Sequence, residues 1–435
     1  MPAGLWLPRI GAAIRINDQT AIRVGWARYA TNLLAVIGPS WNIPQYGYSA
    51  TTSVQSPLQG VPQATLSNPF PAANPLLLPL GNSLGRYTNL GNSAAWINQG
   101  LNTPVNDRFN VSLQRALPGG LRLDATYFAN LGHNVQPPSN GGGSFAARNV
   151  NMADPKLGYT YKSALDQKVA NPFYHYMTPQ TFPGQLWNQA QVPVSSLLEP
   201  YPQYGSLTED FLSGFSEHYQ ALQLKAERAF SRGYSLMVAY NYNREASDVY
   251  FNDPAQYANL LTMMPSANPR HRISGAAAYD LPLGNGRKYL TNLRPVLNAV
   301  LGGWTTSHIF TWNSGGFLRF GQMIVNGDPV LGSPTQAHWF NTSVFQAPQP
   351  YTPRTNPWQY PGLTGPRFWQ LDSTLSKNFQ ISERFRIEFR MEAYNLFNKF
   401  IPSNPDTNVY SSTFGMSTNQ ANLGREMQYA LKLYF

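Results

Sequence analysis

The histidines are the side chains best suited to hold a metal ion or move a proton near neutral pH. No HExxH or other close ligand pair occurs, and His271 lies between Arg270 and Arg272, whose positive charge disfavours binding of a cation. The six histidines are His133, His175, His218, His271, His308 and His338. The chain has no cysteine, which excludes thiolate metal sites, thiol catalysis and disulfides. We therefore expect no metal site and no cofactor.

Motifs for catalysis and for phosphate binding are weak or missing. The stretch "GNGRK" (284–288) contains a G-x-G, but no helical pattern follows it, so a tight turn is the better interpretation. No G-x-S-x-G occurs, and no motif places two carboxylates together. We expect no catalytic residue and no enzyme activity.

The net charge of +10 raises the question of an anionic partner. A nucleic acid is not expected as a partner, because there is no Lys/Arg run, no basic helix and no zinc-finger spacing. The charges are dispersed, and many lie near acidic residues. Simple solvated charge is the favoured interpretation, and attraction to an anionic surface such as lipopolysaccharide is the alternative.

The charged residues follow a period of two, which is the side-chain period of a β-strand. Between positions 384 and 393, charged residues alternate with Phe385, Ile387, Phe389, Met391 and Ala393. The charged set there is Arg384, Arg386, Glu388, Arg390 and Glu392. Other strands place Arg15, Arg23, Arg122, Asp124, Lys225 and Glu227 on their polar side. We expect all of these to face a lumen, either as a self-neutralising ladder or in contact with a passing solute.

Alternation of this kind predicts about eleven long strands, and helical periodicity is hard to find. The predicted strands are 9–17, 20–29, 107–117, 120–130, 216–230, 233–245, 269–281, 302–313, 367–380, 384–397 and 424–435. Several are longer than the usual strand of a soluble protein, and they suit the ~9–11 residues that cross a bilayer on a tilt. No apolar stretch approaches the ~18 residues of a membrane-spanning helix.

Long and short connections alternate along the chain. The short ones are "NDQ" (17–19), "PGG" (118–120), "SRG" (231–233) and "ISE" (381–383), with an intermediate one between 281 and 301. The long ones, roughly 30–106, 131–215, 246–268, 314–366 and 398–423, are predicted to lack regular structure. Short periplasmic turns opposite long extracellular loops are typical of a bacterial outer-membrane barrel. The fold class expected is therefore all-β, an antiparallel transmembrane β-barrel segment in the cell outer membrane.

The last residues, "MQYALKLYF" (427–435), predict a final strand that is used to its end. In lipid an open sheet edge is not tolerated, so a terminal strand must pair with another to close the ring. The residues of this stripe are Tyr429, Leu431, Leu433 and Phe435. They resemble the signal that the outer-membrane barrel insertion machinery reads.

Aromatic residues near predicted strand ends suggest the girdles of a membrane interface. They are Trp26, Tyr127, Trp304, Trp312, Trp369, Tyr394 and Phe435. Loop tryptophans such as Trp187, Trp339 and Trp358 either pack their loops or stack on a sugar-like ligand.

Several stretches resemble the TonB-dependent receptor family, in particular its Oar-like branch. The most specific is "FRIEFRMEAYNLFNKF" (385–400), followed by "STFG" (412–415) and "REMQYALKLYF" (425–435). Others are "LPRIGAAIRINDQTAIRVGWARYA" (7–30), "FNVSLQRALPGGLRLDATYFANLGHNV" (109–135), "HYQALQLKAERAFSRGYSLMVAYNYNREASD" (218–248), "NPRHRISGAAAYDLPLGNGRKYL" (268–290), "LGGWTTSHIFTWNSG" (301–315) and "WFNTSVF" (339–345). The resemblance implies uptake of a solute through a plug-gated pore powered by TonB.

The family's barrels have more strands than are predicted here, together with a plug and a TonB-contacting segment at the amino end. We therefore expect residues 1–435 to be a carboxyl-terminal barrel segment without plug, signal peptide or TonB-contacting segment, so that TonB acts only through a missing part. The solute is not identified. The alternatives are a plugless passive channel and a soluble β-rich carbohydrate-binding or adhesive protein.

Overall fold

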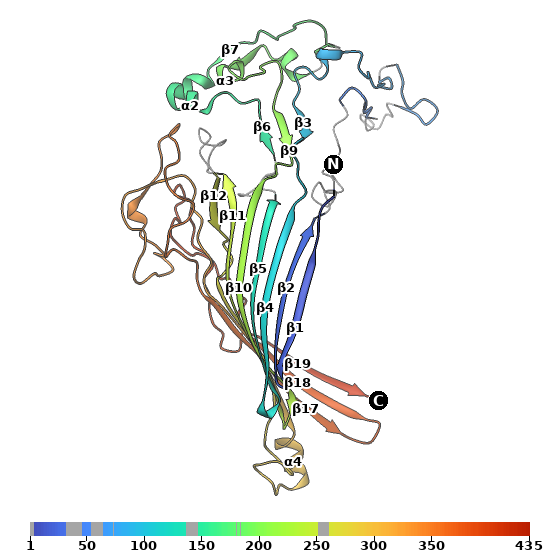
Figure 1. Cartoon of the computed structure of the whole chain (residues 1–435), viewed down its shortest axis with the longest axis vertical. Coiled ribbons are helices and arrows are strands. Elements are labelled where there is room, and N and C mark those ends of the chain that lie inside the picture. Colours follow the sequence, from blue (N-terminus) through green and yellow to red (C-terminus); the bar gives the residue numbers. More distant parts are fainter. Residues whose placement is uncertain are drawn as a thin grey trace.

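One large antiparallel sheet dominates the computed structural model of the chain (Figure 1). The structure describes residues 4–31, 46–53, 64–72, 74–135, 147–179, 181–182, 184–250 and 261–435. The main path of the sheet is β1 (Arg9–Asn17), β2 (Thr20–Ala30), β4 (Val105–Leu117), β5 (Leu121–Val135), β10 (Phe215–Ser231), β11 (Tyr234–Tyr250), β13 (His271–Asp280), β14 (Trp304–Asn313), β17 (Phe368–Gln380), β18 (Arg386–Tyr394) and β19 (Glu426–Tyr434). A further strand, β12 (Leu261–Pro265), pairs with the upper part of β11.

All eleven predicted strands are confirmed. They could be predicted because a strand with one apolar and one polar face shows alternating apolar and polar residues in its sequence. Neighbours along the chain are also neighbours in the sheet, so each strand pairs with the next of the main path. The ends differ most where β5 and β11 continue beyond the prediction toward the long loops. There, hydrogen bonding to β10 and to β12 extends the ladder past the point where the sequence alternation fades.

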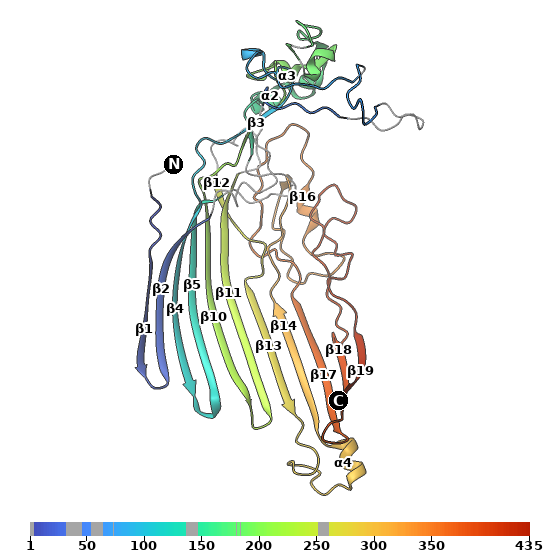
Figure 2. The same cartoon turned by 90° about the vertical axis from the view of Figure 1, so that its right-hand side faces the viewer.

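The sheet is open, and β1 and β19 are its two edges. In the described part of the chain β1 pairs with β2 alone, and β19 pairs with β18 alone. Because every pair along this eleven-strand path is antiparallel, the first and last strands run in the same direction. Figure 2 shows the strands side by side in chain order, with the sheet curving from β1 to β19.

All short connections lie at one end of the sheet, as predicted from their alternation with long ones (Figure 2). The turn between β4 and β5 uses Gly119 and Gly120, both at φ 79°, a left-handed conformation that glycine adopts without strain. The turn between β10 and β11 likewise has positive φ at Arg232 and Gly233. The intermediate connection carries a short helix, α4 (Pro295–Leu301), at this same end.

The prediction that the long connections lack regular structure is wrong. The first two of them form one cap, in which β3 (Ala94–Ile97) pairs in parallel with β9 (Leu207–Asp210), and β6 (Arg148–Asn149) pairs with β9 on its other side. A second ribbon joins β7 (Lys168–Ala170) to β8 (Gln191–Pro193), and the cap also holds α2 (Pro155–Tyr161) and α3 (Val194–Leu197). None of the described helices is both long enough and apolar enough to span a membrane.

Buried amides explain why the cap was not visible in the sequence pattern. The side-chain nitrogen of Asn151, a residue 1% exposed, donates to the carbonyls of Tyr201 and Gly205 and to a carboxylate oxygen of Glu199. Asn171 donates in the same way to the carbonyls of Leu186 and Gln189. These contacts join segments far apart in sequence and have no periodicity.

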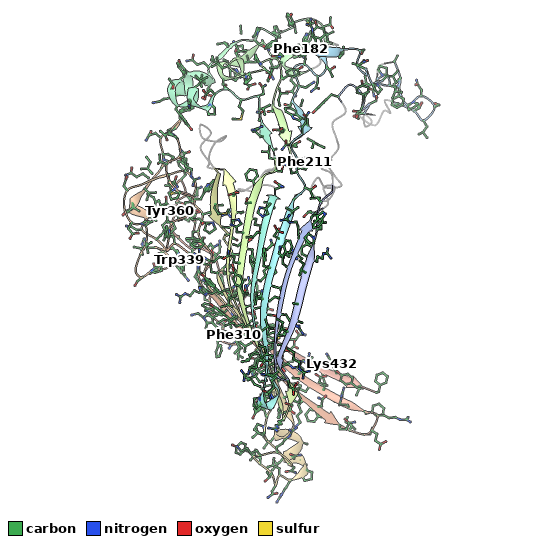
Figure 3. All side chains as sticks on the ribbon, in the orientation of Figure 1. Phe182, Phe211, Phe310, Trp339, Tyr360 and Lys432 are labelled. Atoms are coloured by element: carbon green, nitrogen blue, oxygen red, sulfur yellow. The ribbon has the colours of Figure 1, made fainter. Side chains whose placement is uncertain are left out.

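A cluster of buried apolar side chains lies in the loop between β14 and β17, beside the upper ends of the strands (Figure 3 labels Trp339 and Tyr360). Its buried members are Leu318, Phe320, Met323, Phe340, Phe345, Tyr360 and Leu363. The buried guanidinium of Arg354 donates to the backbone carbonyls of Phe320, Asn356 and Pro357. Burial lowers the pKa of Arg354 to about 10. This loop is therefore a folded lobe.

Candidate functional site

The register of the sheet divides its residues into two faces. Directly opposed residues of an antiparallel pair share a face, so the pairs can be followed from strand to strand. One row runs from Arg15 through Ala21, Gln114, Asp124, Lys225, Ala239, Ser274 and Thr311 to Gln370. In β18, Glu388 opposes Asn378 and Lys432, whereas Phe389 opposes Leu431. We call the face with Asp124 and Glu388 the polar face and the opposite one the apolar face.

The predicted charged residues lie on the polar face wherever the strand register places them. Arg23 opposes Ser112 in a row that continues through Thr126 and Gln223 to Asn241. Arg384 is the exception, because β18 begins at Arg386 and Arg384 lies in the turn before it. That these residues face a lumen stays a prediction.

Five of these residues gather around one hollow at the short-turn end of the polar face. The hollow measures about 460 Å³ and is lined by Arg15, Arg122, Asp124, Lys225 and Glu227, among others. We call it the charged hollow.

Most charges of the charged hollow have a neutralising or hydrogen-bonding partner. The Nζ of Lys225 lies 2.5 Å from Oε2 of Glu227, and Arg122 directly opposes Glu227. Asp124 accepts hydrogen bonds from Gln114 Nε2 and Thr126 Oγ1, each at 2.7 Å.

The charged row of β18 forms a similar ladder. The guanidinium of Arg390 lies 3.3 Å from a carboxylate oxygen of Glu388 and 3.2 Å from one of Glu392. The hydroxyl of Tyr434 donates to Glu388 at 2.6 Å, and that of Tyr394 donates to Glu392 at 3.0 Å. These contacts agree with the interpretation of the row as a self-neutralising ladder.

A second hollow on the polar face is mostly apolar, although Arg122 and Glu227 also line it, and sequence reasoning missed it. It measures about 850 Å³, and its lining includes Met237, Ala276 and Ile309, which follow Glu227 in one register row. Met237 is 42% exposed and Ile309 is 59% exposed. We call it the apolar hollow. The only sequence signal was "GAAAY" (275–279), a stretch in which apolar residues occupy both parities.

The apolar face exposes large hydrophobic side chains along most of its strands. Examples are Ile14, Val111, Leu113, Leu222, Leu224, Leu236, Tyr429 and Leu431. Its charges lie toward strand ends: Arg28 pairs with Asp107 at 2.8 Å, and the Nζ of Lys377 contacts the carbonyl of Gly302 beside the Trp304 ring. Such a distribution matches a lipid-facing surface, on which charge is least costly near the interfaces.

One polar group near the middle of the apolar face is His308, and its hydrogen bonds are satisfied within the sheet. Its Nδ1 lies 2.8 Å from Ser373 Oγ, and its Nε2 lies 3.1 Å from Thr306 Oγ1. Because the Thr306 hydroxyl donates to the Thr374 carbonyl, it accepts from His308 Nε2–H. Within the described residues, no three His, Asp or Glu side chains gather as a metal site.

Two aromatic residues do not fit the predicted girdle. Tyr394 lies on the polar face with Glu392, and Tyr127 lies near the middle of β5 rather than at its end. Trp26 opposes Ile10 near the start of β1, and it stacks on Phe109 at 6.3 Å between ring centroids. The period of two in the sequence predicts which face of the strand carries Tyr127. It does not predict how far along the strand Tyr127 lies, because that depends on where β5 ends.

The most specific stretch of the sequence, "YNLFNKF", has an architectural role. Asn395 is 2% exposed and has φ 51°, a left-handed turn that asparagine tolerates. Its side chain accepts from Lys399 N–H and donates to the carbonyls of Lys399 and Leu423, while its own N–H donates to Asp372. The residue thus fixes the exit of β18 against β17 and the segment that leads into β19.

Solved structures with a similar arrangement are outer-membrane receptors and transporters. They include the pyoverdine outer membrane receptor FpvA from Pseudomonas aeruginosa PAO1 (11% identity, TM-score 0.41, covering 99% of this chain and 36% of that one). Another is the outer membrane transporter YddB from Escherichia coli (12% identity, TM-score 0.41, covering 96% of this chain and 38% of that one). A third is the siderophore receptor PiuA from Acinetobacter baumannii (9% identity, TM-score 0.39, covering 98% of this chain and 35% of that one). The chain spans about a third of the length of the solved structures that it resembles.

No curated protein matches the chain by sequence. A family model described as an outer membrane beta barrel domain matches residues 3–428, which is nearly the whole chain. This match agrees with the open antiparallel sheet, its apolar face and its segregated loops. The chain belongs to the outer membrane β-barrel domain family and is a protein of the outer membrane.

Proposed function

We propose that the chain forms part of the wall of a TonB-dependent outer-membrane transporter, which takes up a solute through a plug-gated pore. The polar face lines the pore, and the apolar face contacts lipid. The observation that supports this most strongly is the division of β18, where Glu388, Arg390 and Glu392 lie opposite in direction to Phe389 and Met391.

The orientation follows from the cost of charge in lipid. An arginine or lysine at the midplane of the lipid face of a barrel costs about 2–4 kcal/mol. Turning the sheet around would place the ladder of β18 and the charged hollow in hydrocarbon, and it would expose Leu222 and Leu224 to water. Only one orientation of the sheet avoids both penalties.

The edges of the sheet support a larger barrel. Unpaired backbone groups are not tolerated in hydrocarbon, so β1 and β19 need partners. Because they run in the same direction, direct closure between them would require a parallel pair. Antiparallel closure instead needs an odd number of further strands. We therefore propose that residues 1–435 supply the carboxyl-terminal arc of the wall and that the plug, with its TonB contact, belongs to the rest of the assembly. A passive barrel built from these strands alone is disfavoured by the same argument.

The edge strand β19 is proposed to carry the signal for the barrel insertion machinery. On its apolar face Leu431 is 72% exposed, and Phe435, the residue that follows β19, is 93% exposed. They are available to a partner that captures this strand before the ring closes.

Spin labels test the orientation. Because the chain has no cysteine, single cysteines at Ile387, Glu388 and Phe389 can be labelled without background. In lipid, labels at Ile387 and Phe389 are expected to be relaxed by oxygen, and a label at Glu388 by a water-soluble nickel chelate. Equal accessibility at all three positions would contradict the proposal.

Two further measurements separate the transporter from a passive channel. Cysteines introduced in pairs along β1 and β19 are expected not to form disulfides within one chain, because other strands lie between these edges. The native outer-membrane protein is expected to show no steady ion conductance in planar bilayers, because a plug closes the pore. Disulfides between the edges together with steady conductance would support the passive channel.

A further inference from the structure

A cavity of about 440 Å³ lies between β12 and the loop lobe. Its walls are formed by Met263 and Met264 of β12, by Phe317 and by the segment 357–362. Arg270 completes the lining. This size lies within the range of pockets that hold small organic ligands.

The cavity lies next to the long-loop end of the polar face. Arg270 precedes β13 by one residue and has the same parity as Arg272, which opposes Asn241 on the polar face. Asn243, on the same face of β11, donates from its side chain to the carbonyl of Pro269 and from its backbone to that of Arg270. The backbone around Arg270 is thus held against the sheet, where the pore would open to the outside.

Arg270 supplies a cation without a carboxylate partner. Its guanidinium carbon lies 4.6 Å from the centroid of the Phe317 ring, and among the described residues it takes part in no ion pair. The carboxylate of nearby Glu245 accepts instead from Asn268 Nδ2 at 2.9 Å. Stacking on an aromatic ring orients a guanidinium while leaving its edge free for an anion.

Arg354 shows what a structural arginine looks like in the same lobe. It is 2% exposed, and three backbone carbonyls accept its hydrogen bonds. Arg270, by contrast, is partly exposed and lines the cavity. The two residues therefore differ in role: Arg354 holds the lobe together, and Arg270 is available to a ligand.

The other walls are apolar and adaptable. Met263 is 40% exposed, and methionine is unbranched and polarizable, so it fits ligands of varied shape. The rings of Phe317 and Trp358 offer flat surfaces, and Gln359 is already occupied, since its Nε2 donates to the carbonyl of Pro265. A ligand here would meet one cation and a largely apolar surface.

We propose that this cavity binds an organic anion, with a flat apolar body against Met263 and Phe317 and a carboxylate on Arg270. The inference rests on the proposed function, because it names the class of solute that would be captured at the outer mouth of the pore. A carboxylate bound to a guanidinium makes charge-assisted hydrogen bonds, which an uncharged amide of the same shape cannot reproduce.

The test uses a matched pair of probes, 2-naphthoate and 2-naphthamide, which differ in charge but hardly in shape. Binding is measured by titration calorimetry on the protein purified from outer membranes in detergent, with protein-free micelles as the blank. The protein is expected to bind 2-naphthoate about tenfold or more tightly than 2-naphthamide, the order expected for a hydrogen bond to a charged group.

Two variants test whether Arg270 causes the preference for 2-naphthoate over 2-naphthamide. Arg270→Gln is expected to bind both probes equally, and Arg272→Gln is expected to keep the preference, because Arg272 lies on the same face outside the cavity lining. Heat-modifiable mobility on gels checks that each variant is folded. Equal binding of the two probes by the unmodified protein, or a preference that survives in Arg270→Gln, would overturn the proposal.

A third variant covers the apolar wall. Met263→Trp fills the cavity and is expected to lower the affinity for both probes. An unchanged affinity would place the ligand elsewhere and overturn the proposal. Failure of the proposed function would be seen separately, because the spin-label pattern on β18 does not depend on this cavity.

Discussion

The charged hollow and the apolar hollow are adjacent regions of one face, yet their side chains differ in kind. Arg122 and Glu227 line both hollows, and Glu227 directly opposes Met237, which lines only the second. At this shared edge Lys225 pairs with Glu227. Farther along the row Ile309 is 59% exposed, and it is opposed by Ala276 of β13 and by Asp372 of β17.

The contrast shows that one face of a barrel wall can offer two kinds of surface. A wall that touched only water would gain nothing from exposing Met237 and Ile309, because exposed apolar surface is costly. An internal domain that packs against the wall would bury them, and the charged hollow would fix its register through polar contacts. The exposed Met237 and Ile309 thus agree with the plug that is part of the proposed function.

The largest effect is expected from adding charge beside the apolar hollow. Phe310 and Ile309 are consecutive residues of β14 on opposite faces. Phe310→Arg is expected to lower the free energy of unfolding by about 2–4 kcal/mol if it lies near the midplane, because it places charge in lipid. Ile309→Arg is expected to cost less, since the polar face is proposed to line the lumen and Ile309 directly opposes Asp372, which can pair with an arginine. Denaturant titration in lipid vesicles measures both, and equal costs would show that the apolar hollow is part of the lipid surface.

A medium effect is expected from making the charged hollow apolar. Asp124→Leu removes the acceptor of the hydrogen bonds from Gln114 and Thr126. The free energy of unfolding is expected to fall by about 1.5–3 kcal/mol, the usual value for a hydrogen bond to a charged group. Ala239→Leu is the matched control, because it adds the same side chain in the same register row without removing a hydrogen bond. If the two variants have the same free energy of unfolding in the same vesicles, the polar contacts of the charged hollow do not stabilise the protein.

The smallest effect is expected from the ion pair at the boundary. Lys225 and Glu227 are 45% and 38% exposed, so their coupling in a double-mutant cycle with glutamine at both positions is expected to be below about 1 kcal/mol. The coupling should shrink as salt rises, because exposed pairs are screened. A coupling well above this value that persists at high salt would indicate that the pair is shielded from water.

The strands and their two faces could be read directly from the order of residues. Side chains of a strand point to the same face every second residue. The alternation in 384–393 or 222–230 therefore predicts which side chains share a face, whatever the strand packs against. The short turns were also visible, because residues such as Gly119 and Gly233 allow positive φ there. These are local properties, and local signals are sufficient for them.

Contacts between distant segments needed the folded chain. The parallel pair of β3 with β9, the carbonyls around Asn151, the stacking of Arg270 on Phe317 and the row from Glu227 to Ile309 all join residues that are far apart in sequence. No period relates such residues, because their meeting depends on strand register and on how the loops fold back. Alternation told us that Arg122 and Glu227 would share a face; register alone placed them opposite each other.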